Sequence, residues 1–277
     1  LTEIAVNGEN PDFSAIDGVL YGRYADEIDF GESGVLYAVP PAYYKTDLVL
    51  PASVRIVIPY AVNFQQSLET ITLNEGLENI GKAAFYTAAR VVVSNESGSS
   101  VYKYLTFHIR SVRLPSTVSH IGASIFLGAD VQEFSIAEDN PVYYTDGNLV
   151  YSGRTLIMSM GIEDEAVIRD GIEIIASAAF MNQSLQRVEI PDSVREIGHN
   201  AFNGCSSLTT VIIGKGLETL APAAFSALKN LQTVQVSAEN PYFHSDGGML
   251  YSKNKRKLLL CAAKNGLTDL SGLPEEI

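Results

Sequence analysis

Apolar and polar residues alternate along the chain in short units that recur about every 22 residues. The clearest unit begins with Val188-Glu189-Ile190, and the same pattern returns as Val211-Ile212-Ile213, 23 residues later. Because successive side chains of a strand point to opposite faces, the two outer residues of each triplet should face the core and the middle one solvent. A fixed period between 20 and 50 residues is typical of a solenoid, in which identical turns stack.

Eleven such triplets can be followed through the chain, and each predicts a short strand. Seven of them are followed, twelve positions after their last residue, by an aliphatic or aromatic residue that should pack between neighbouring turns. The predicted strands are 4–6, 48–50, 71–73, 91–93, 112–114, 134–136, 166–168, 188–190, 211–213, 234–236 and 268–270. The predicted core residues are Val62, Phe85, Leu105, Phe126, Phe180, Phe202 and Phe225.

Three longer turns, at residues 10–21, 140–151 and 240–251, share a motif of their own. Each contains Asn-Pro and then Asp-Gly, which are strong turn dipeptides, followed by an apolar pair and Tyr. The motif predicts a hairpin added to each of these turns. Gly81, Gly122 and Gly198 stand eight positions after a triplet, where a tight bend of the return leg is expected.

The period runs from end to end without a linker, so a single domain covering 1–277, with about eleven turns, is predicted. Both ends match the interior of repeats elsewhere, and a solenoid needs capped ends, so the chain is expected to be part of a longer one. No apolar run approaches the ~20 residues of a membrane-spanning helix, and no signal peptide is present in these residues.

The formal net charge is −13, which argues against a nucleic-acid partner because phosphate binding depends on Lys and Arg. Two cysteines are too few for a disulfide framework. Cys205 and Cys261 fall about two turns apart, roughly 10 Å along the stack, which is too far for a bridge. Both are predicted to be buried thiols that act as small hydrophobic residues.

The stretch from residue 185 to 208 resembles the BspA-type leucine-rich repeat of bacterial surface proteins. The matching positions are Leu185, Val188, Ile190, Pro191, Ser193, Val194, Ile197, Gly198, Ala201, Phe202, Cys205 and Leu208. The resemblance implies a right-handed leucine-rich repeat solenoid, mainly β, with a parallel concave sheet, irregular or 3-10 return legs and three hairpin insertions. It also implies a cell-surface or extracellular protein, since some members are adhesins for host matrix proteins or for other bacteria.

The sequence contains no motif for catalysis, and no catalytic residue, metal ligand or cofactor is predicted. Nucleotide-binding loops, a nucleophile elbow and a His-Glu-x-x-His helix are absent, and the four histidines stand alone. Asp17, Asp146 and Asp246 are interpreted as turn residues, with calcium as the alternative, although no ladder of acidic residues accompanies them. The basic run 253–257 is interpreted as a solvated hairpin tip.

The remaining candidate is the exposed face of the predicted sheet, formed by the middle residues of the triplets and by the residues just before them. Solenoid sheets commonly bind partners on such a face, and Arg is enriched at interface hot spots. The candidate ligand-binding residues are Thr72, Arg90, Arg113, Glu133, Ser135, Glu165, Arg187, Glu189, Thr210 and Gln235.

These features predict a non-enzymatic, monomeric binding or adhesion module whose partner is a host or bacterial surface protein, possibly a glycan. One alternative is a structural spacer that presents another domain. The other is a glycan-binding module of the cell envelope, with tyrosines of the inserts as stacking platforms. Those tyrosines are Tyr21, Tyr143, Tyr144, Tyr151, Tyr242 and Tyr251.

Overall fold

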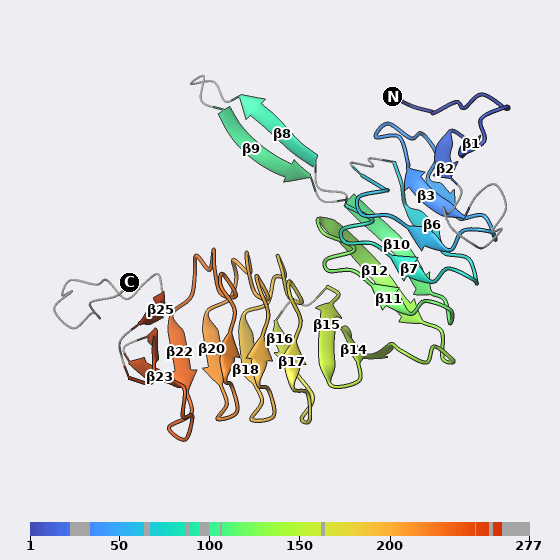
Figure 1. Cartoon of the computed structure of the whole chain (residues 1–277). Helices are drawn as coiled ribbons and strands as arrows, with labels where there is room; N and C mark the ends of the chain where they lie inside the picture. Colours follow the sequence, from blue (N-terminus) through green and yellow to red (C-terminus); the bar gives the residue numbers. More distant parts are fainter. Residues whose placement is uncertain are drawn as a thin grey trace. The chain divides into compact units, whose positions relative to one another are not determined.

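The computed structural model describes residues 1–22, 34–63, 67–86, 89–94, 100–105, 107–161, 164–246, 248–254 and 257–261; between 87 and 107 only the backbone is described. The chain divides into two compact units, Leu1–Tyr144 and Thr145–Ile277. Both are built from short β-strands (Figure 1). Across the described ranges no helix has the length and apolar character needed to cross a membrane. The single continuous domain stays a prediction.

The first unit contains a parallel sheet in the order β12-β10-β6-β4. Its strands carry four of the predicted triplets, in which the outer residues face the interior and the middle residue is exposed. The strands are β4 (Asp47–Val49), β6 (Thr70–Thr72), β10 (Phe107–Leu114) and β12 (Ala129–Ile136).

A second sheet of this unit, in the order β1-β2-β3-β5-β7-β11, forms the return side of the turns. Its first three strands are antiparallel and its last three are two-residue strands in parallel register. They are β1 (Phe13–Ile16), β2 (Val19–Gly22), β3 (Val35–Ala38), β5 (Ile56–Val57), β7 (Asn79–Ile80) and β11 (His120–Ile121). The antiparallel part is the first predicted hairpin, with Asp17-Gly18 at its turn.

Residues 91–93 are not one of the stacked parallel strands, or rungs, of the solenoid, so the prediction of such a strand there was wrong. These residues lie in β8 (Ala89–Ser94), which pairs antiparallel with β9 (Ser100–Leu105) in a separate two-stranded sheet. Ser111 of β10 pairs directly with Thr70 of β6, so the hairpin is an insertion within one long turn. Its apolar alternation imitates a rung because a hairpin strand and a stacked strand share the same two-residue period.

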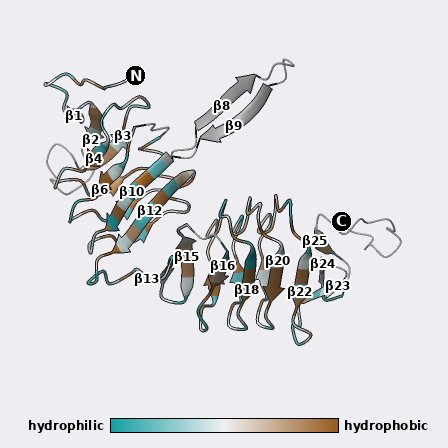
Figure 2. Ribbon diagram, turned by 180° about the vertical axis from the view of Figure 1, so that it is seen from behind, coloured by the Kyte–Doolittle hydropathy of each residue, from teal (hydrophilic) through white to brown (hydrophobic). Residues whose placement is uncertain are grey.

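The second unit contains the more regular parallel sheet, in the order β16-β18-β20-β22. Val188 pairs with Val211, and Val211 with Val234, so the triplets stack in register. Figure 2 shows β20 at the hydrophobic end of the scale, as its sequence TVII requires. The strands are β16 (Glu165–Val167), β18 (Arg187–Ile190), β20 (Thr210–Ile213) and β22 (Thr233–Val236).

The return side of the second unit forms a sheet in the order β13-β14-β15-β17-β19-β21, and a three-stranded sheet β23-β24-β25 follows. These two sheets contain the second and third predicted hairpins, so all three predicted insertions are confirmed. The strands are β13 (Tyr144–Asp146), β14 (Leu149–Ser152), β15 (Thr155–Ser159), β17 (Ile174–Ile175), β19 (Glu196–Ile197), β21 (Thr219–Leu220), β23 (Phe243–Asp246), β24 (Met249–Ser252) and β25 (Leu258–Cys261).

The aromatic residues twelve positions after the triplets stack on one another inside the turns. Phe180 and Phe202 have ring centroids 4.8 Å apart and nearly parallel planes, and Phe225 continues the stack 5.0 Å from Phe202. In the first unit, Phe85 and Phe126 stack at 5.3 Å. These core predictions are confirmed, as is the burial of Val62; Leu105 belongs to β9, whose side chains lie outside the described ones. The predicted solenoid fold class is thus confirmed.

The shared spacing of Gly81, Gly122 and Gly198 has a different cause from the expected tight bend. A Cβ on Gly198 would lie 2.6 Å from the backbone nitrogen of Ser177, and the other two glycines approach a neighbouring turn equally closely. The left-handed bend instead falls two residues later, at positions such as Ala83 and Asn200, where φ is 49° and 56°. Glycine is required here because two turns touch, not because the chain bends.

Two further expectations need correction. Residues 4–6 form no strand, although the backbone nitrogen of Ile4 donates to the carbonyl of Gly18 at 2.9 Å. Cys205 is a buried free thiol, and burial raises its pKa to about 12. Cys261 is free but only partly buried, which departs from the prediction of two buried thiols. The predicted strand 268–270 lies outside the described residues.

In two of the three Asn-Pro motifs the Asn acts as a clamp between turns. Asn240 is fully buried, donates from Nδ2 to the carbonyls of Gly214 and Leu217 at 3.1 Å, and accepts from the backbone nitrogens of Tyr242 and Phe243 at 2.8 Å. Asn140 makes the same four bonds to its own preceding turn and following residues. A single amide thus fixes the start of the hairpin to the turn before it.

Candidate functional site

The exposed side of the first unit's parallel sheet carries two rows of side chains that cross the strands. We call these eight residues the first-unit face. Strand pairing places Thr72 next to Val49 and Ser135 next to Arg113. The rows are Val49, Thr72, Arg113 and Ser135, and Asp47, Thr70, Ser111 and Glu133.

Charges on the first-unit face are only partly satisfied by the protein itself. Asp47 accepts hydrogen bonds from the hydroxyls of Thr70 and Thr46, which lower the pKa of its carboxyl group. Arg113 and Glu133 are exposed, and neither side chain has a hydrogen bond or ion pair to any residue that the structure describes. One acidic group is therefore held in place while one cation and one anion remain open to a ligand.

The corresponding side of the second unit's sheet, here called the second-unit face, also has two rows. Arg187 pairs with Thr210 across the strands, and Glu189 pairs with Ile212. Val167 is 79% exposed, which is unusual for a large aliphatic residue in a strand. The rows are Val167, Glu189, Ile212 and Gln235, and Glu165, Arg187, Thr210 and Thr233.

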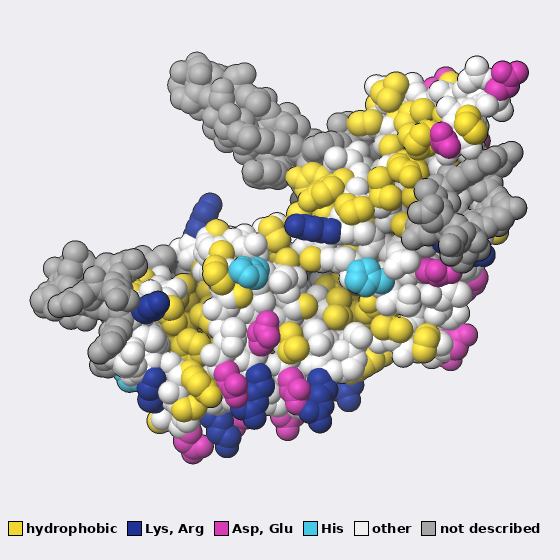
Figure 3. Space-filling model, in the orientation of Figure 1, with side chains coloured by type: hydrophobic (Ala, Val, Ile, Leu, Met, Phe, Trp, Pro, Cys, Tyr) yellow, Lys and Arg dark blue, Asp and Glu magenta, His cyan; other side chains and the backbone are white. Residues whose placement is uncertain are grey.

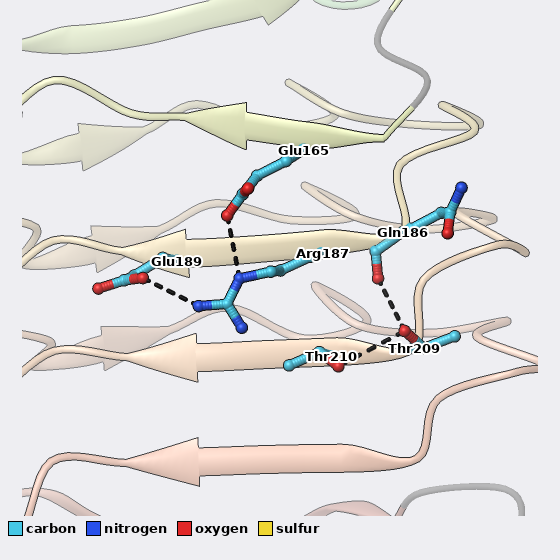
Figure 4. A network of polar contacts seen from close by, with 6 residues as sticks. All are labelled: Glu165, Gln186, Arg187, Glu189, Thr209 and Thr210. Carbon is cyan, nitrogen blue, oxygen red and sulfur yellow. Dashed lines mark hydrogen bonds and ion pairs between the residues drawn. The ribbon is translucent and has the colours of Figure 1, made fainter.

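Arg187 is closed into a network of carboxylates, drawn in Figure 4. Its Nε lies 2.9 Å from Oε1 of Glu165 on the adjacent strand, and its second terminal nitrogen lies 3.1 Å from Oε2 of Glu189 on the same strand. Beside this network the Thr209 hydroxyl donates to the backbone carbonyl of Gln186 at 3.0 Å. One cation between two carboxylates leaves the network with a net negative charge.

A shallow open pocket of about 360 Å³ lies at one edge of the second-unit face. Glu189, Ile212 and Gln235 line it from three adjacent strands, and Asp192 and Ser237 line it from the loops that follow. The pocket lining mixes these polar residues with apolar ones such as Ile213 and Val236. This mixture suits a side chain from a partner surface rather than an enclosed small molecule.

The loops at this end of the second unit are rich in ion pairs between turns. In Figure 3, acidic and basic side chains alternate along the lower edge of the unit. Lys215 lies 3.6 Å from both Asp192 and Glu239, and Arg195 lies 2.8 Å from Glu218. Surface pairs of this kind contribute about 0–1 kcal/mol each, so they add little to the stability of the stacked turns.

Nine of the ten candidate residues lie on the two faces. Thr72, Arg113, Glu133 and Ser135 lie together on the first, and Glu165, Arg187, Glu189, Thr210 and Gln235 on the second. Arg90 does not join them, because its backbone belongs to the inserted strand β8; its side chain lies outside the described ones.

The candidate set leaves out the two most exposed apolar residues of the faces, Val49 and Val167, which are 64% and 79% exposed. Both occupy the middle of a triplet, so their position identified them as exposed. The candidate set was chosen for polar and charged side chains, so these two exposed valines were not included, although strand alternation places them on the same faces.

The tyrosines of the inserts do not form a common stacking platform. Tyr21, Tyr143, Tyr151 and Tyr251 are buried, and burial raises the pKa of Tyr21 and Tyr143. The Tyr143 hydroxyl accepts a hydrogen bond from the backbone nitrogen of Ile121 at 3.0 Å, which ties the insert to the preceding turn. Tyr144 and Tyr242 are the exposed ones, at 37% and 47%.

The Asp residues of the turns show no arrangement for a cation. Asp17 has φ +53° and lies 2.8 Å from Nζ of Lys45, and Asp146 lies 3.5 Å from Nε of Arg169. In the part of the chain that the structure describes, no three His, Cys, Asp or Glu side chains come together as a metal ion would need.

Several solved structures are similar to this chain, and the alignment with the first of them supports the fold. A leucine-rich repeat protein from Eubacterium ventriosum aligns over 92% of this chain and 74% of its own, with a TM-score of 0.52 and 15% sequence identity. A leucine-rich cell surface protein from Faecalibacterium prausnitzii aligns over 68% of this chain and 53% of its own, so the chain spans about half of its length, with a TM-score of 0.48 and 22% identity. The pneumococcal vaccine antigen PcpA aligns over 83% of this chain and 71% of its own, with a TM-score of 0.44 and 16% identity.

A search among curated proteins gives no match. The model of one protein family matches residues 42–146 and 163–247, about two thirds of the chain, as six copies of its repeat. Its matched ranges contain both exposed faces. The family is a repeat family and not a catalytic domain. With the stacked triplets and the aromatic column, this match identifies the chain as a member of the BspA-type leucine-rich repeat family.

Proposed function

We propose that this chain is a non-enzymatic protein-binding module that works at a bacterial cell surface or outside the cell. The observation that carries the proposal is the pair of ordered, exposed sheet faces, where side chains from successive turns stand in register. Solenoid proteins use such extended faces for binding because each turn adds one more row of side chains. The description of the F. prausnitzii neighbour as a cell surface protein motivates the location.

The binding module is favoured over a glycan-binding module of the cell envelope by the burial of four of the six insert tyrosines. A sugar-binding platform needs aromatic rings open to solvent, and Tyr144 and Tyr242 stand in separate inserts. The spacer hypothesis assigns no ligand to either face and makes the opposite prediction in a binding experiment.

The test is binding of the chain to an array of host matrix proteins and bacterial surface proteins, with three variants that introduce the same side chain. Thr72→Arg blocks the first-unit face, Gln235→Arg blocks the second-unit face, and Thr219→Arg places the same residue on β21 of the return side. We expect a specific partner that Thr219→Arg leaves bound and that one of the face variants loses by about tenfold or more.

Two results would count against the proposal. A partner that binds all three variants equally would remove the sheet faces as the binding surface. An array without any specific binding would favour the spacer, and a fusion partner that supplies binding on its own would strengthen that alternative.

A further inference from the structure

Arg113 differs from every other arginine whose side chain the structure describes. Each of the others has an acceptor within the protein: a backbone carbonyl for Arg55 and carboxylates for the rest, namely Arg110, Arg154, Arg169, Arg187 and Arg195. In a chain of net charge −13, with 19 Lys and Arg against 32 Asp and Glu, cations are scarce. Among the arginine side chains within the described ranges, Arg113 alone has no internal acceptor, and it lies on an inner strand of an exposed sheet.

An open carboxylate accompanies it. Arg113 on β10 stands opposite Ser135 of β12, and Glu133 lies two residues before Ser135 on the same strand and the same face. With strands about 4.8 Å apart and a rise of about 3.3 Å per residue, the two positions are about 8 Å apart diagonally. The first-unit face therefore presents one cation and one anion side by side, and neither is neutralised by a residue within the described ranges.

The surroundings of the two charges leave room for a partner chain. The nearest positions in the rows are occupied by small hydroxyl residues, Thr72, Ser111 and Ser135, and Val49 adds an apolar contact two strands away from Arg113. No aromatic side chain belongs to the first-unit face. Such a flat surface of β-branched and hydroxyl side chains fits an extended peptide better than a sugar ring.

We propose that Arg113 and Glu133 form a two-charge recognition site for an extended segment of a partner protein that carries an acidic and a basic side chain two residues apart. In an extended segment, side chains at i and i+2 point the same way and stand about 6.6 Å apart, close to the diagonal between the two groups. Each ligand charge then meets its opposite. This inference deepens the proposed function and depends on it.

The pairing of charges selects against other ligands. A polyuronate or a nucleic acid carries charge of one sign, so any contact it made with Arg113 would bring a second anion against Glu133. A basic peptide would meet the opposite conflict at Arg113. Only a segment with both signs at the right spacing satisfies the two groups together, which is how charge patterns provide specificity more than raw affinity.

The experiment uses the whole chain and nine-residue peptides of alternating Thr and Val with two variable positions, i and i+2. The variable pairs are Glu/Lys, Gln/Gln, Glu/Glu and Lys/Lys, and a hyaluronan oligosaccharide serves as the glycan probe. Each peptide is displayed on tetravalent streptavidin so that weak binding can be measured. We expect the Glu/Lys peptide to bind best, and Arg113→Gln and Glu133→Gln each to weaken it about fivefold.

A switch of preference tests the geometry more sharply. Glu133→Arg leaves two cations on the face and should prefer the Glu/Glu peptide, whereas Arg113→Glu leaves two anions and should prefer the Lys/Lys peptide. Lys82→Gln is the matched control, because Lys82 is an exposed cation of a return leg and its loss changes the net charge by the same amount as Arg113→Gln. That control should bind the Glu/Lys peptide as the unaltered chain does.

Several outcomes would overturn the site. Equal binding of the Glu/Lys and Gln/Gln peptides, no peptide binding, or no change of preference in the two charge variants would each do so. Stronger binding of hyaluronan, further strengthened by Glu133→Gln, would assign the face to an anionic glycan instead. A different result would reject only this recognition site. In that case a partner from the protein array binds Arg113→Gln and Glu133→Gln as it binds the unaltered chain but does not bind Thr72→Arg. The proposed function would then stand.

Discussion

The two exposed faces are built from the same repeat positions, yet they treat charge in opposite ways. On the second-unit face Arg187 is bonded to a carboxylate directly across the strands and to another two residues along its own strand. On the first-unit face the nearest acidic position to Arg113 is diagonal, and the two groups remain apart. For these two arginines, the register between neighbouring strands determines whether the charged side chain pairs within the protein or stays open to a ligand.

The turns behind these faces also differ. Successive rungs of the second unit pair 22 or 23 residues apart, whereas β6 and β10 of the first unit pair at 41 because the β8–β9 hairpin interrupts the return leg. Phe85 and Phe126 nevertheless stack across the interrupted turn at 5.3 Å. The aromatic stacking and the parallel pairing of β6 with β10 thus persist in a turn that carries the insertion.

The largest expected loss of stability comes from truncating the stacked aromatic residues, which can be compared between the two units. Phe202 lies between Phe180 and Phe225 and is fully buried, so Phe202→Ala should lower the free energy of unfolding by about 4 kcal/mol. Phe126 stacks on Phe85, meets Phe134 edge-on at 6.0 Å and is 8% exposed, so Phe126→Ala should cost about 3 kcal/mol. Urea unfolding measures both values; a larger loss for Phe126→Ala would reverse the comparison.

The next effect compares a clamp Asn with the Asn of the first Asn-Pro motif. Asn240→Ala removes four hydrogen bonds in a buried site and leaves backbone groups unpaired, so a loss of about 3 kcal/mol is expected. Asn10 is exposed and accepts only from the backbone nitrogens of Asp12 and Phe13, so Asn10→Ala should cost about 1 kcal/mol or less. Urea unfolding and amide exchange at Tyr242 and Phe243 would report the difference. Equal losses would show that the bonds to the preceding turn contribute nothing.

How far the sequence predicts this fold depends on which contacts are periodic. The triplets and the aromatic column follow from hydrophobic spacing alone, because every turn repeats the same burial. The two-residue strands β5, β7, β11, β17, β19 and β21 have no such signal, since they are defined by hydrogen bonds between turns. Likewise, the β8–β9 hairpin has the same alternation as a rung, and only its antiparallel partner distinguishes it.

The candidate site, too, could be predicted only in part from the sequence. Strand alternation predicts which residues are exposed, so nine of the ten candidates fall on the two faces. Whether a charge is paired depends on side-chain reach between neighbouring strands, which requires the register. The sequence could therefore propose Arg113 and Arg187 as equivalent candidates but could not separate the open one from the closed one.

A smaller effect is expected from removing the insertion that distinguishes the first unit. Deletion of residues 87–106 shortens the step between β6 and β10 to 21 residues, close to the period of the other turns. The sheet β12-β10-β6-β4 should keep its register, and the free energy of unfolding should change by about 1 kcal/mol or less because loop-closure cost varies slowly with length. Amide exchange across β10 provides the measurement. Loss of protection in β6 and β10 would make the hairpin a structural part of the turn.

The smallest effect returns to the charges on the faces. Arg187→Gln removes two exposed ion pairs and should cost at most about 0.5 kcal/mol at low salt, a difference that disappears at high salt as the charges are screened. Arg113→Gln has no internal pair to lose, so its free energy of unfolding should match that of the unaltered chain at either ionic strength. Urea unfolding of both variants in low and high salt makes the comparison. If Arg113→Gln proved as salt-sensitive as Arg187→Gln, Arg113 would be engaged within the protein, and the contrast between an open and a closed face would fail at its central residue.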